Sequence, residues 1–280
     1  MIFGKNKSFK LFWYRLDWGE TIMPELPDVE NFKRYFNRTS LNKIIKQVEV
    51  KNKKVMQVDE ETLKEAVRYH EFTETKRHGK YLFARLNKKW IMFHFGMTGD
   101  FKYFKNRSED PEHDRLMFTF SNGYHLAFVN QRLLGKVDLV ENVEEFIEKK
   151  NLGPDALEIT FEEFKEIFDR KKYVKSTLMD QKLVSGVGNI YADEILFQSK
   201  VHPKTKSNTL SDKKLKKMYN TMRRVFRISI KHNAKMDELP RGYIISRREK
   251  GEKCPKCKGK IKRVKISGRS SYICPKCQKT

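Results

Sequence analysis

The pattern of hydrophobic and polar residues along this chain predicts strands in some segments and helices in others. In residues 24–140, short apolar runs rich in β-branched and aromatic residues predict strands, and Asn122-Gly123 between two of these runs is typical of a hairpin turn. Helical spacing of apolar positions predicts short helices over residues 29–36 and 60–70. The predicted strands cover residues 44–50, 81–86, 90–95, 115–120, 124–129 and 136–140.

The hydrophobic pattern changes after residue 140. An acidic segment over residues 141–160 contains a Gly-Pro turn and predicts a linker, and helical periodicity dominates from 161 to 233. Residues 185–189, SGVGN, predict a glycine-containing turn between two helices. These patterns predict an α+β multidomain protein, in which a β-sandwich with edge helices precedes a helical domain. The predicted ranges are 23–140 for the sandwich, 141–160 for the linker, 161–240 for the helical domain and 241–280 for a cysteine-containing tail.

All four cysteines of the chain lie in that tail. Cys254 and Cys257 form one C-x2-C pair, Cys274 and Cys277 form another, and 16 residues separate the two pairs. This spacing is typical of a tetrahedral four-cysteine zinc site on a short hairpin. The alternative is a redox pair or unused thiols. Because four thiolates leave no position for a substrate water, we expect one structural Zn²⁺.

Charge is unevenly distributed along the 280 residues. The whole chain carries a formal net charge of +24, and residues 241–280 hold 14 Lys or Arg against two acidic residues. A basic protein of this kind favours an anionic polymer as partner, because each neutralised phosphate releases a counterion. The alternative is that the basic residues only maintain solubility. We therefore expect a nucleic-acid-binding protein.

Two classes of protein are disfavoured by composition. No apolar run approaches the roughly 18 residues that a membrane span needs, so no membrane partner is expected. The aromatic N-terminal stretch is interrupted by Lys10, Arg15 and Asp17, which makes it a poor signal-peptide core. No cysteine is left for a disulfide framework, which fits a reducing cytosol.

Four motifs occur along the chain in one order. They are MPELPDVE at 23–30, HFGMTG at 94–99, LMDQKLVSGVGNIYADEILF at 178–197, and the four-cysteine tail. Together they resemble the formamidopyrimidine-DNA glycosylase and endonuclease VIII family of base-excision repair enzymes, as a divergent branch. The resemblance spans nearly all of 23–278. It implies an N-terminal β-sandwich, a helix–two-turn–helix domain and a C-terminal zinc finger.

The resemblance makes Pro24 the nucleophile, once the preceding methionine has been removed. Chemistry requires that this proline be terminal. An internal proline nitrogen is an amide whose lone pair is delocalised, whereas a terminal proline is a secondary amine that can attack deoxyribose C1′. Pro24 therefore fits this role only in a chain without residues 1–23.

The genetic code bears on where the chain starts. Trp18-Gly19-Glu20 must be encoded as TGG-GGN-GAR, a purine-rich run that resembles a bacterial ribosome-binding site. Only six nucleotides then precede the Met23 codon. We therefore expect Met23 to be the true start and residues 1–22 to be a mis-called start. The alternative is a genuine extension.

Other roles follow from the resemblance, residue by residue. Glu25 is expected to be the general acid/base at the opening sugar, although a helix-start carboxylate is the alternative. Lys80 corresponds to the lysine that grips the phosphate beside the lesion, with a solvated strand-end lysine as its alternative. Asp28 stands where the family usually has glutamate, which is one methylene longer.

Further residues are expected to contact DNA. His94, Asn189 and Arg269 match phosphate-contacting positions, and Lys175 resembles a lysine near the damaged-base pocket. For His94 the alternative is a core histidine, and for Asn189 a plain helix N-cap. Such phosphate contacts would position the duplex rather than read its sequence.

Two residues are expected to support the flipped-out state of the damaged nucleotide. Met97 resembles the side chain that fills the gap in the base stack, with a core methionine as the alternative. Arg132 matches the arginine of a D-P-R-R-F-G-like segment, which here reads NQRLLG over residues 130–135. Leu134 replaces the aromatic residue of that segment, so the opposite-base preference and the preference for 8-oxoguanine are left open.

These features predict a DNA glycosylase with AP lyase activity that acts on oxidised bases in duplex DNA and cuts by β,δ-elimination. From the resemblance we expect a monomer in the bacterial cytoplasm, associated with the nucleoid when it is bound to DNA. Two alternatives remain. One is a non-catalytic zinc-finger DNA-binding protein, if the N-terminal extension is retained, and the other is an RNA-associated or ribosome-associated zinc-ribbon protein.

Overall fold

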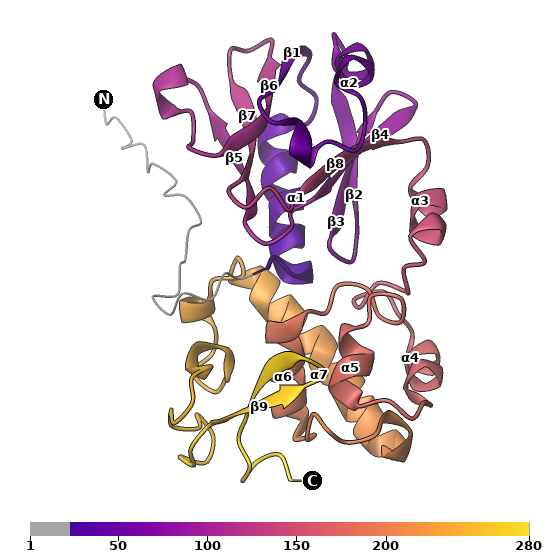
Figure 1. The fold of residues 1–280 in the computed structure, drawn as a ribbon, viewed down its shortest axis with the longest axis vertical. Helices are drawn as coiled ribbons and strands as arrows, with labels where there is room; N and C mark the ends of the chain where they lie inside the picture. The colour runs from indigo at the N-terminus through magenta and orange to yellow at the C-terminus, as the bar shows by residue number, and fades with distance from the viewer. Residues whose placement is uncertain (1–22, 280) are drawn as a thin grey trace, which may run out of the picture.

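The computed structural model describes residues 23–279, so the expected mis-called start at residues 1–22 lies outside it. Within those residues, two four-stranded antiparallel sheets form the N-terminal half, with strand orders β1-β6-β7-β5 and β2-β3-β4-β8 (Figure 1). Helix α1 contacts β2 of one sheet and β5 of the other, and α2 packs on β1. The bounds of these elements are α1 (Leu26–Ser40), β1 (Ile45–Val50), α2 (Glu60–Val67), β2 (Phe72–His78), β3 (Tyr81–Leu86), β4 (Lys89–His94), β5 (Gly99–Phe104), β6 (Asp114–Phe120), β7 (His125–Asn130) and β8 (Lys136–Val140).

An aromatic core joins the two sheets. Phe93 packs against Phe101 and Phe128 with ring centroids 5.1 and 5.7 Å apart, and Phe72 packs against Phe118 at 5.5 Å. Aromatic pairs at such separations stabilise a core beyond the burial of their area. Helix α1 adds Phe36 to the same cluster, so the expected sandwich with edge helices is confirmed.

The structure contains two strands that the sequence pattern did not predict, β2 and β5. In β2 only Phe72 is buried, and the polar residues that follow it are exposed or partly exposed, because this strand is an edge that pairs with β3 alone. β5 opens with Gly99, where an added Cβ would lie 2.3 Å from the Phe95 carbonyl oxygen. The polar segment of β2 lacks the apolar alternation that marks a half-buried strand, and β5 shows it only from Asp100 to Tyr103.

The expected linker over residues 141–160 is partly helical, because Asn142 caps α3. The Asn142 Oδ1 atom accepts the backbone N–H groups of Glu144 and Glu145 at 2.7 and 3.2 Å. The helical domain that follows is confirmed, with SGVGN joining α5 to α6. The bounds are α3 (Val143–Lys149), α4 (Phe161–Phe168), α5 (Val174–Met179), α6 (Asn189–Ser199) and α7 (Asp212–Lys231), with short 3-10 turns at Lys53–Val55, Arg107–Glu109, Ser207–Thr209, Met236–Glu238 and Ile245–Arg247.

The beginning of α1 belongs to the core of the helical domain. Leu26 is fully buried in that core, and its backbone N–H donates to the Gly186 carbonyl at 3.1 Å. Gly186 has φ +108°, and an added Cβ would lie 2.6 Å from the Leu26 side chain. The chain near Pro24 is therefore attached to the helical domain, although the rest of α1 packs on the sandwich.

The last 40 residues carry the antiparallel hairpin of β9 (Lys262–Ile266) and β10 (Arg269–Ile273). Its turn, Ser267-Gly268, has positive φ at both residues, as a two-residue hairpin of the favoured type requires. β10 packs against α6, and the hairpin lies beside the helical domain (Figure 1).

Candidate active site

Glu25 is held at the start of α6 by backbone hydrogen bonds. Its carboxylate accepts the N–H groups of Gly188, Ile190 and Tyr191 at 2.7, 2.8 and 3.3 Å. A helix N-terminus is a natural anion site, because its first N–H groups have no partner within the helix. Glu25 also caps α1, where its own N–H donates to Asp28 at 2.8 Å. The residue beside Pro24 is thus fixed by two helices from different domains.

Burial makes this carboxyl group a weaker acid than usual. Burial raises the pKa of Glu25, and the positive charge of Lys80 and the three backbone N–H groups oppose that rise. Burial likewise raises the pKa of Asp28 to about 7, helped by the negative charge of Glu25. A raised pKa lets a carboxyl group hold a proton near neutral pH, as a general acid must.

Lys80 lies in the turn between β2 and β3 and faces the same carboxyl groups. Burial lowers its pKa, the charges of Glu25 and Asp28 oppose this, and Arg269 of the zinc-finger hairpin lowers it further. Lys80 is therefore close enough to interact electrostatically with Glu25 and with Arg269, although these residues are far apart in the sequence. The structure thus relates predicted residues of two domains, the sandwich and the zinc finger.

A buried salt bridge fixes the turn that carries Lys80. Asp155 of the interdomain segment accepts the Gly79 N–H at 2.7 Å and pairs with Arg77, which also bonds Glu30 of α1 at 3.0 Å. Gly79 has φ +54°, and an added Cβ would meet the Ser185 Cβ at 2.8 Å. The sequence analysis missed Arg77 and Asp155, because no local pattern links residues 78 positions apart.

Gly188 should tolerate no side chain. An added Cβ would lie 2.3 Å from the Glu25 carboxyl carbon, and Glu25 cannot move away without losing its backbone bonds. We expect Gly188→Ala to destabilise the protein by about 2 kcal/mol, as overpacking in a core does, and to lower base excision. Thermal unfolding and excision assays measure both effects. Gly242→Ala is the control, because its Cβ would meet nothing within 4 Å; equal effects of the two substitutions would contradict the prediction.

Met97 and Arg132 lie on two loops that contact each other. The Arg132 N–H donates to the Thr98 hydroxyl at 3.1 Å, and an added Cβ on Gly96 would lie 2.4 Å from the Leu134 backbone. Met97 is partly buried and Arg132 is exposed. The structure therefore places the loops that carry the two proposed gap-filling residues side by side.

Asn130 joins these two loops, a role that sequence analysis did not assign to it. Its side chain is fully buried, donates to the Phe95 carbonyl at 2.9 Å and accepts the N–H groups of Leu134 and Gly135 at 3.0 and 3.2 Å. The sequence feature that could have pointed to Asn130 is its position as the first residue of the NQRLLG segment.

His94 and Asn189 have different surroundings. His94 is partly buried, its Nδ1 accepts the Gly96 N–H at 3.3 Å, and burial with the nearby charge of Lys80 lowers its pKa to about 4. Its imidazole is thus neutral at pH 7, with Nε2 as the protonated donor. Asn189 is the first residue of α6, after Gly188 as N-cap, and its buried Oδ1 has no partner among the described residues. The N-cap alternative for Asn189 is therefore wrong.

Lys175 is not where a DNA contact would need it. Its side chain is 1% exposed, and its Nζ donates to Asp193 Oδ1 at 2.6 Å and to the Ser270 carbonyl at 3.1 Å. Lys175 was expected near the damaged-base pocket as a DNA contact, and its buried and paired ammonium group contradicts that contact. Burying an unpaired lysine ammonium group is costly, so the side chain of Lys175 points toward the Asp193 carboxylate, which neutralises it. No local sequence pattern links these two residues.

The four cysteines come together as the tail predicted. Their Sγ atoms all lie within 4.8 Å of one another, with Cys254–Cys277 at 3.8 Å and Cys257–Cys274 at 3.4 Å. Tetrahedral zinc with bonds of about 2.3 Å places sulfurs about 3.8 Å apart, so the cluster fits one structural Zn²⁺. Around it lies a small core of Phe197, Ile244, Ile261 and Tyr272.

Loss of one zinc ligand should unfold this finger and leave the sandwich intact, because the two have separate cores. We expect Cys257→Ser to bind well under one equivalent of zinc and to lower DNA affinity at least tenfold, since metal binding supplies folding free energy in such small modules. Metal analysis and DNA titration measure this. Lys258→Ser, at the neighbouring exposed position, is the control. Full zinc occupancy in Cys257→Ser would contradict the prediction.

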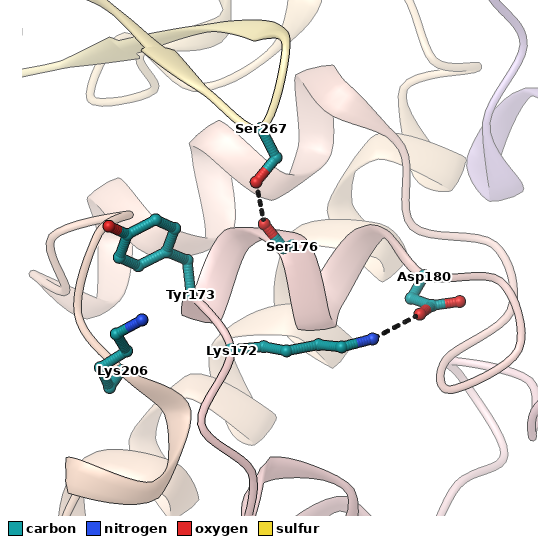
Figure 2. A pocket seen from close by; sticks show the side chains of 6 residues that line it. All are labelled: Lys172, Tyr173, Ser176, Asp180, Lys206 and Ser267. Carbon is teal, nitrogen blue, oxygen red and sulfur yellow. Dashed lines mark hydrogen bonds and ion pairs between the residues drawn. The ribbon is translucent and has the colours of Figure 1, made fainter.

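An open pocket of about 340 Å³ borders the finger (Figure 2). Lys206 lies over the Tyr173 ring at 4.3 Å, Lys172 reaches Asp180 at 3.5 Å, and Ser176 of α5 contacts Ser267 of the hairpin turn at 2.9 Å. None of the predicted site residues lines it. Its importance lies in the Ser176–Ser267 contact, which ties the hairpin turn to α5.

The fold and site define a class of protein: a three-part architecture of sandwich, helical domain and zinc finger, in which a buried glutamate lies within electrostatic reach of a lysine and that lysine within reach of a zinc-finger arginine. Comparisons with known proteins agree. The formamidopyrimidine-DNA glycosylase N-terminal domain matches residues 23–137, the helix–two-turn–helix domain of the same enzymes matches 152–239, and the zinc finger found in these enzymes and isoleucyl-tRNA synthetase matches 251–280.

Relatives extend this match across nearly the whole chain. Formamidopyrimidine-DNA glycosylases of Streptococcus pyogenes and Lactobacillus delbrueckii are 32% and 33% identical, over 92% of this chain and 99% and 100% of theirs. The protein belongs to the formamidopyrimidine-DNA glycosylase family.

Solved structures give the same result. A Lactococcus lactis formamidopyrimidine-DNA glycosylase bound to AP-site DNA has a TM-score of 0.83 and 26% identity, over 91% of this chain and all of that one. The same organism's enzyme bound to FAPY-dG DNA has a TM-score of 0.84 and 25% identity, over the same shares. None of the helices in residues 23–279 has the length and apolar character that a membrane crossing needs.

Proposed function

We propose that this protein is a base-excision repair DNA glycosylase with AP lyase activity, which removes oxidised bases from duplex DNA. The observation that carries the proposal is the position of Glu25. Its carboxyl group, whose pKa is raised by burial, is fixed beside Pro24 and within the electrostatic reach of Lys80. A proton donor and a cation next to an N-terminal amine form the set of groups that an imine-forming lyase needs.

In the proposed reaction, the Pro24 nitrogen attacks deoxyribose C1′ as the bond from C1′ to the base breaks. The base leaves with the bonding electron pair and takes up the proton that the amine loses. Glu25 gives its proton to the ring oxygen as the C1′–O4′ bond breaks, and the nitrogen and C1′ are left joined as an iminium. The iminium acidifies the C2′ proton, whose loss breaks the C3′–O bond by β-elimination. A second elimination breaks the C5′–O bond, and water then releases the amine.

The remaining residues are proposed to hold the DNA. Lys80 and Arg269 present two cations for phosphate, while His94 through Nε2 and Asn189 through its amide group supply hydrogen-bond donors. Met97 and Arg132 would occupy the space left by the flipped nucleotide, a step that costs a few kcal/mol and least for a damaged base. Leu134, on the same loop as Arg132, is 47% exposed. Its aliphatic side chain would contact the opposite DNA strand in place of an aromatic ring.

We further propose that the protein acts as a monomer in the bacterial cytoplasm, associated with the nucleoid when it binds DNA. The other function to be tested is that of a non-catalytic DNA-binding protein, which applies if residues 1–22 are retained. The match to the N-terminal domain of the family begins at residue 23, which supports Met23 as the working start.

The deciding experiment is the intact mass of protein expressed from its own gene with the upstream DNA kept. We expect a chain that begins at Pro24 and forms a borohydride-trapped adduct with an abasic duplex. A chain that begins at Met1, gives no adduct and still binds DNA would establish the non-catalytic function instead.

A further inference from the structure

The zinc-finger hairpin is attached to the helical domain on both sides of Arg269. On one side, Ser176 of α5 contacts Ser267 in the hairpin turn at 2.9 Å (Figure 2). On the other side, the neighbouring Lys175 donates to the Ser270 carbonyl at 3.1 Å. Two successive residues of α5 therefore bracket the short segment that carries Arg269.

Asp193 of α6 completes this attachment. Its carboxylate accepts the Lys175 Nζ at 2.6 Å, the Ser271 hydroxyl at 2.6 Å and the Tyr272 N–H at 3.1 Å. It also pairs with Arg248 at 3.0 Å, and the Asp193 side chain is fully buried. Residues 270, 271 and 272 are thus each bonded to Asp193 or to its partner Lys175.

The attachment of the hairpin also determines where the positive charge of Arg269 lies. Arg269 is exposed, yet it lies near enough to Lys80 to lower the pKa of that lysine. Two like charges repel, and the contacts of residues 267 and 270–272 with the helical domain hold Arg269 in place against that repulsion. Contacts that keep the Arg269 and Lys80 cations in place leave a preformed site for a DNA phosphate. The negative charge of the bound phosphate then offsets the repulsion between the two cations.

We propose that Asp193 and Lys175 are positioning residues that hold Arg269 in place for DNA phosphate binding. Asp193 neutralises the buried Lys175 ammonium and fixes β10 directly, and Lys175 fixes the backbone next to Arg269. Neither side chain touches DNA. The inference rests on the proposed function, because it requires Arg269 to bind DNA.

The test is a double-mutant cycle between Asp193→Asn and Arg269→Ala. The measurement is the Kd for a duplex carrying a tetrahydrofuran abasic-site analogue, over a range of salt concentrations. Loss of one charge-assisted phosphate contact should weaken binding about tenfold and reduce the salt slope by about one. We expect Asp193→Asn to reproduce both changes, and the double mutant to bind no worse than Arg269→Ala alone.

Asp193→Asn could instead unfold the finger, since two buried cations would lose their partner. Ser271→Ala is the milder variant, because it removes one hydroxyl donor to Asp193 and leaves the ion pairs. Its expected loss of affinity is about threefold, within the range of one neutral hydrogen bond, and that loss should vanish in the Arg269→Ala background. Ser270→Ala is the matched control, since the Ser270 hydroxyl bonds the exposed Arg263 rather than Asp193.

The proposal would be overturned if, in both double mutants, the loss of DNA affinity equalled the product of the losses in the two single mutants. Asp193 would then stabilise the fold without acting through Arg269. A Ser271→Ala loss no larger than that of Ser270→Ala would also overturn the proposal. Zinc content is measured for every variant. If Asp193→Asn has lost zinc, the double-mutant cycle between Ser271→Ala and Arg269→Ala tests the proposal instead. Failure of the proposed function is separately visible: the wild-type protein would then form no trapped adduct, whereas binding to the tetrahydrofuran duplex needs no amine chemistry.

Discussion

Pro24→Gly, in a chain that begins at residue 24, should lower the yield of borohydride-trapped adduct at least a hundredfold. The ring of proline fixes the rotation about its N–Cα bond and keeps the secondary amine in one direction, whereas a terminal glycine is a freely rotating primary amine. Nucleophile and acid must be aligned within a narrow range for the effective concentration on which such catalysis depends. Trapping on an abasic duplex, followed by gel separation, measures the effect.

Binding provides the control for the Pro24 prediction. The Kd for a tetrahydrofuran duplex should change less than about threefold, because no phosphate contact involves Pro24. A second control is the chain that retains residues 1–23, in which the Pro24 nitrogen is an amide and no adduct should form. Equal trapping by Pro24→Gly and the wild type, or strong trapping by the extended chain, would assign the nucleophile elsewhere.

Glu25→Gln should lower base excision by about a hundredfold to ten-thousandfold, the range that a positioned general acid contributes. Burial raises the pKa of Glu25, so the protonated acid persists toward neutral pH and is lost as pH rises through that raised pKa. The wild-type rate should therefore fall on the alkaline side. Glutamine cannot exchange this proton, so the fall attributable to Glu25 should be absent in the variant. Single-turnover excision rates between pH 5 and 9 measure both effects.

The matched control for the Glu25 prediction is Glu163→Gln. Glu163 also accepts a backbone N–H at a helix start, from Thr160 at 2.8 Å, but it lies in α4, outside the proposed site. Its substitution should leave the excision rate and its pH profile unchanged. A normal rate in Glu25→Gln, or an equal loss in Glu163→Gln, would remove Glu25 from the proposed chemistry.

Much of the fold follows from local patterns, and the exceptions have physical causes. Six strands were expected from short apolar runs rich in β-branched and aromatic residues, and the helices at 29–36 and 60–70 from apolar positions at helical spacing. β2 and β5 were missed: β2 is a polar edge strand, and β5 depends on Gly99 fitting against Phe95. The helix α3 inside the expected linker depends on the Asn142 cap, a signal of one residue.

Among the candidate residues, Lys175 shows how far sequence reasoning reaches. Its place in the motif was visible, but its direction was decided by Asp193, 18 positions away and buried. The same holds for Asn130, whose bonds join two loops 35 positions apart. Such groups have no local periodicity, because their partners are chosen by tertiary packing and by the cost of burying an unpaired polar atom.

The sequence by itself determined the zinc ligands and the order of the three parts of the fold, and its resemblance to a known family pointed to Pro24 and Glu25 as the proposed nucleophile and acid. The zinc ligands depend on residue type and on short spacings, which metal chemistry restricts tightly. Only the tertiary structure decided that Glu25 lies at the N-terminus of α6, that Lys80 is within electrostatic reach of both Glu25 and Arg269, and that Lys175 turns inward. Those depend on contacts between distant segments, where burial and charge pairing select one arrangement among many that the local sequence would allow.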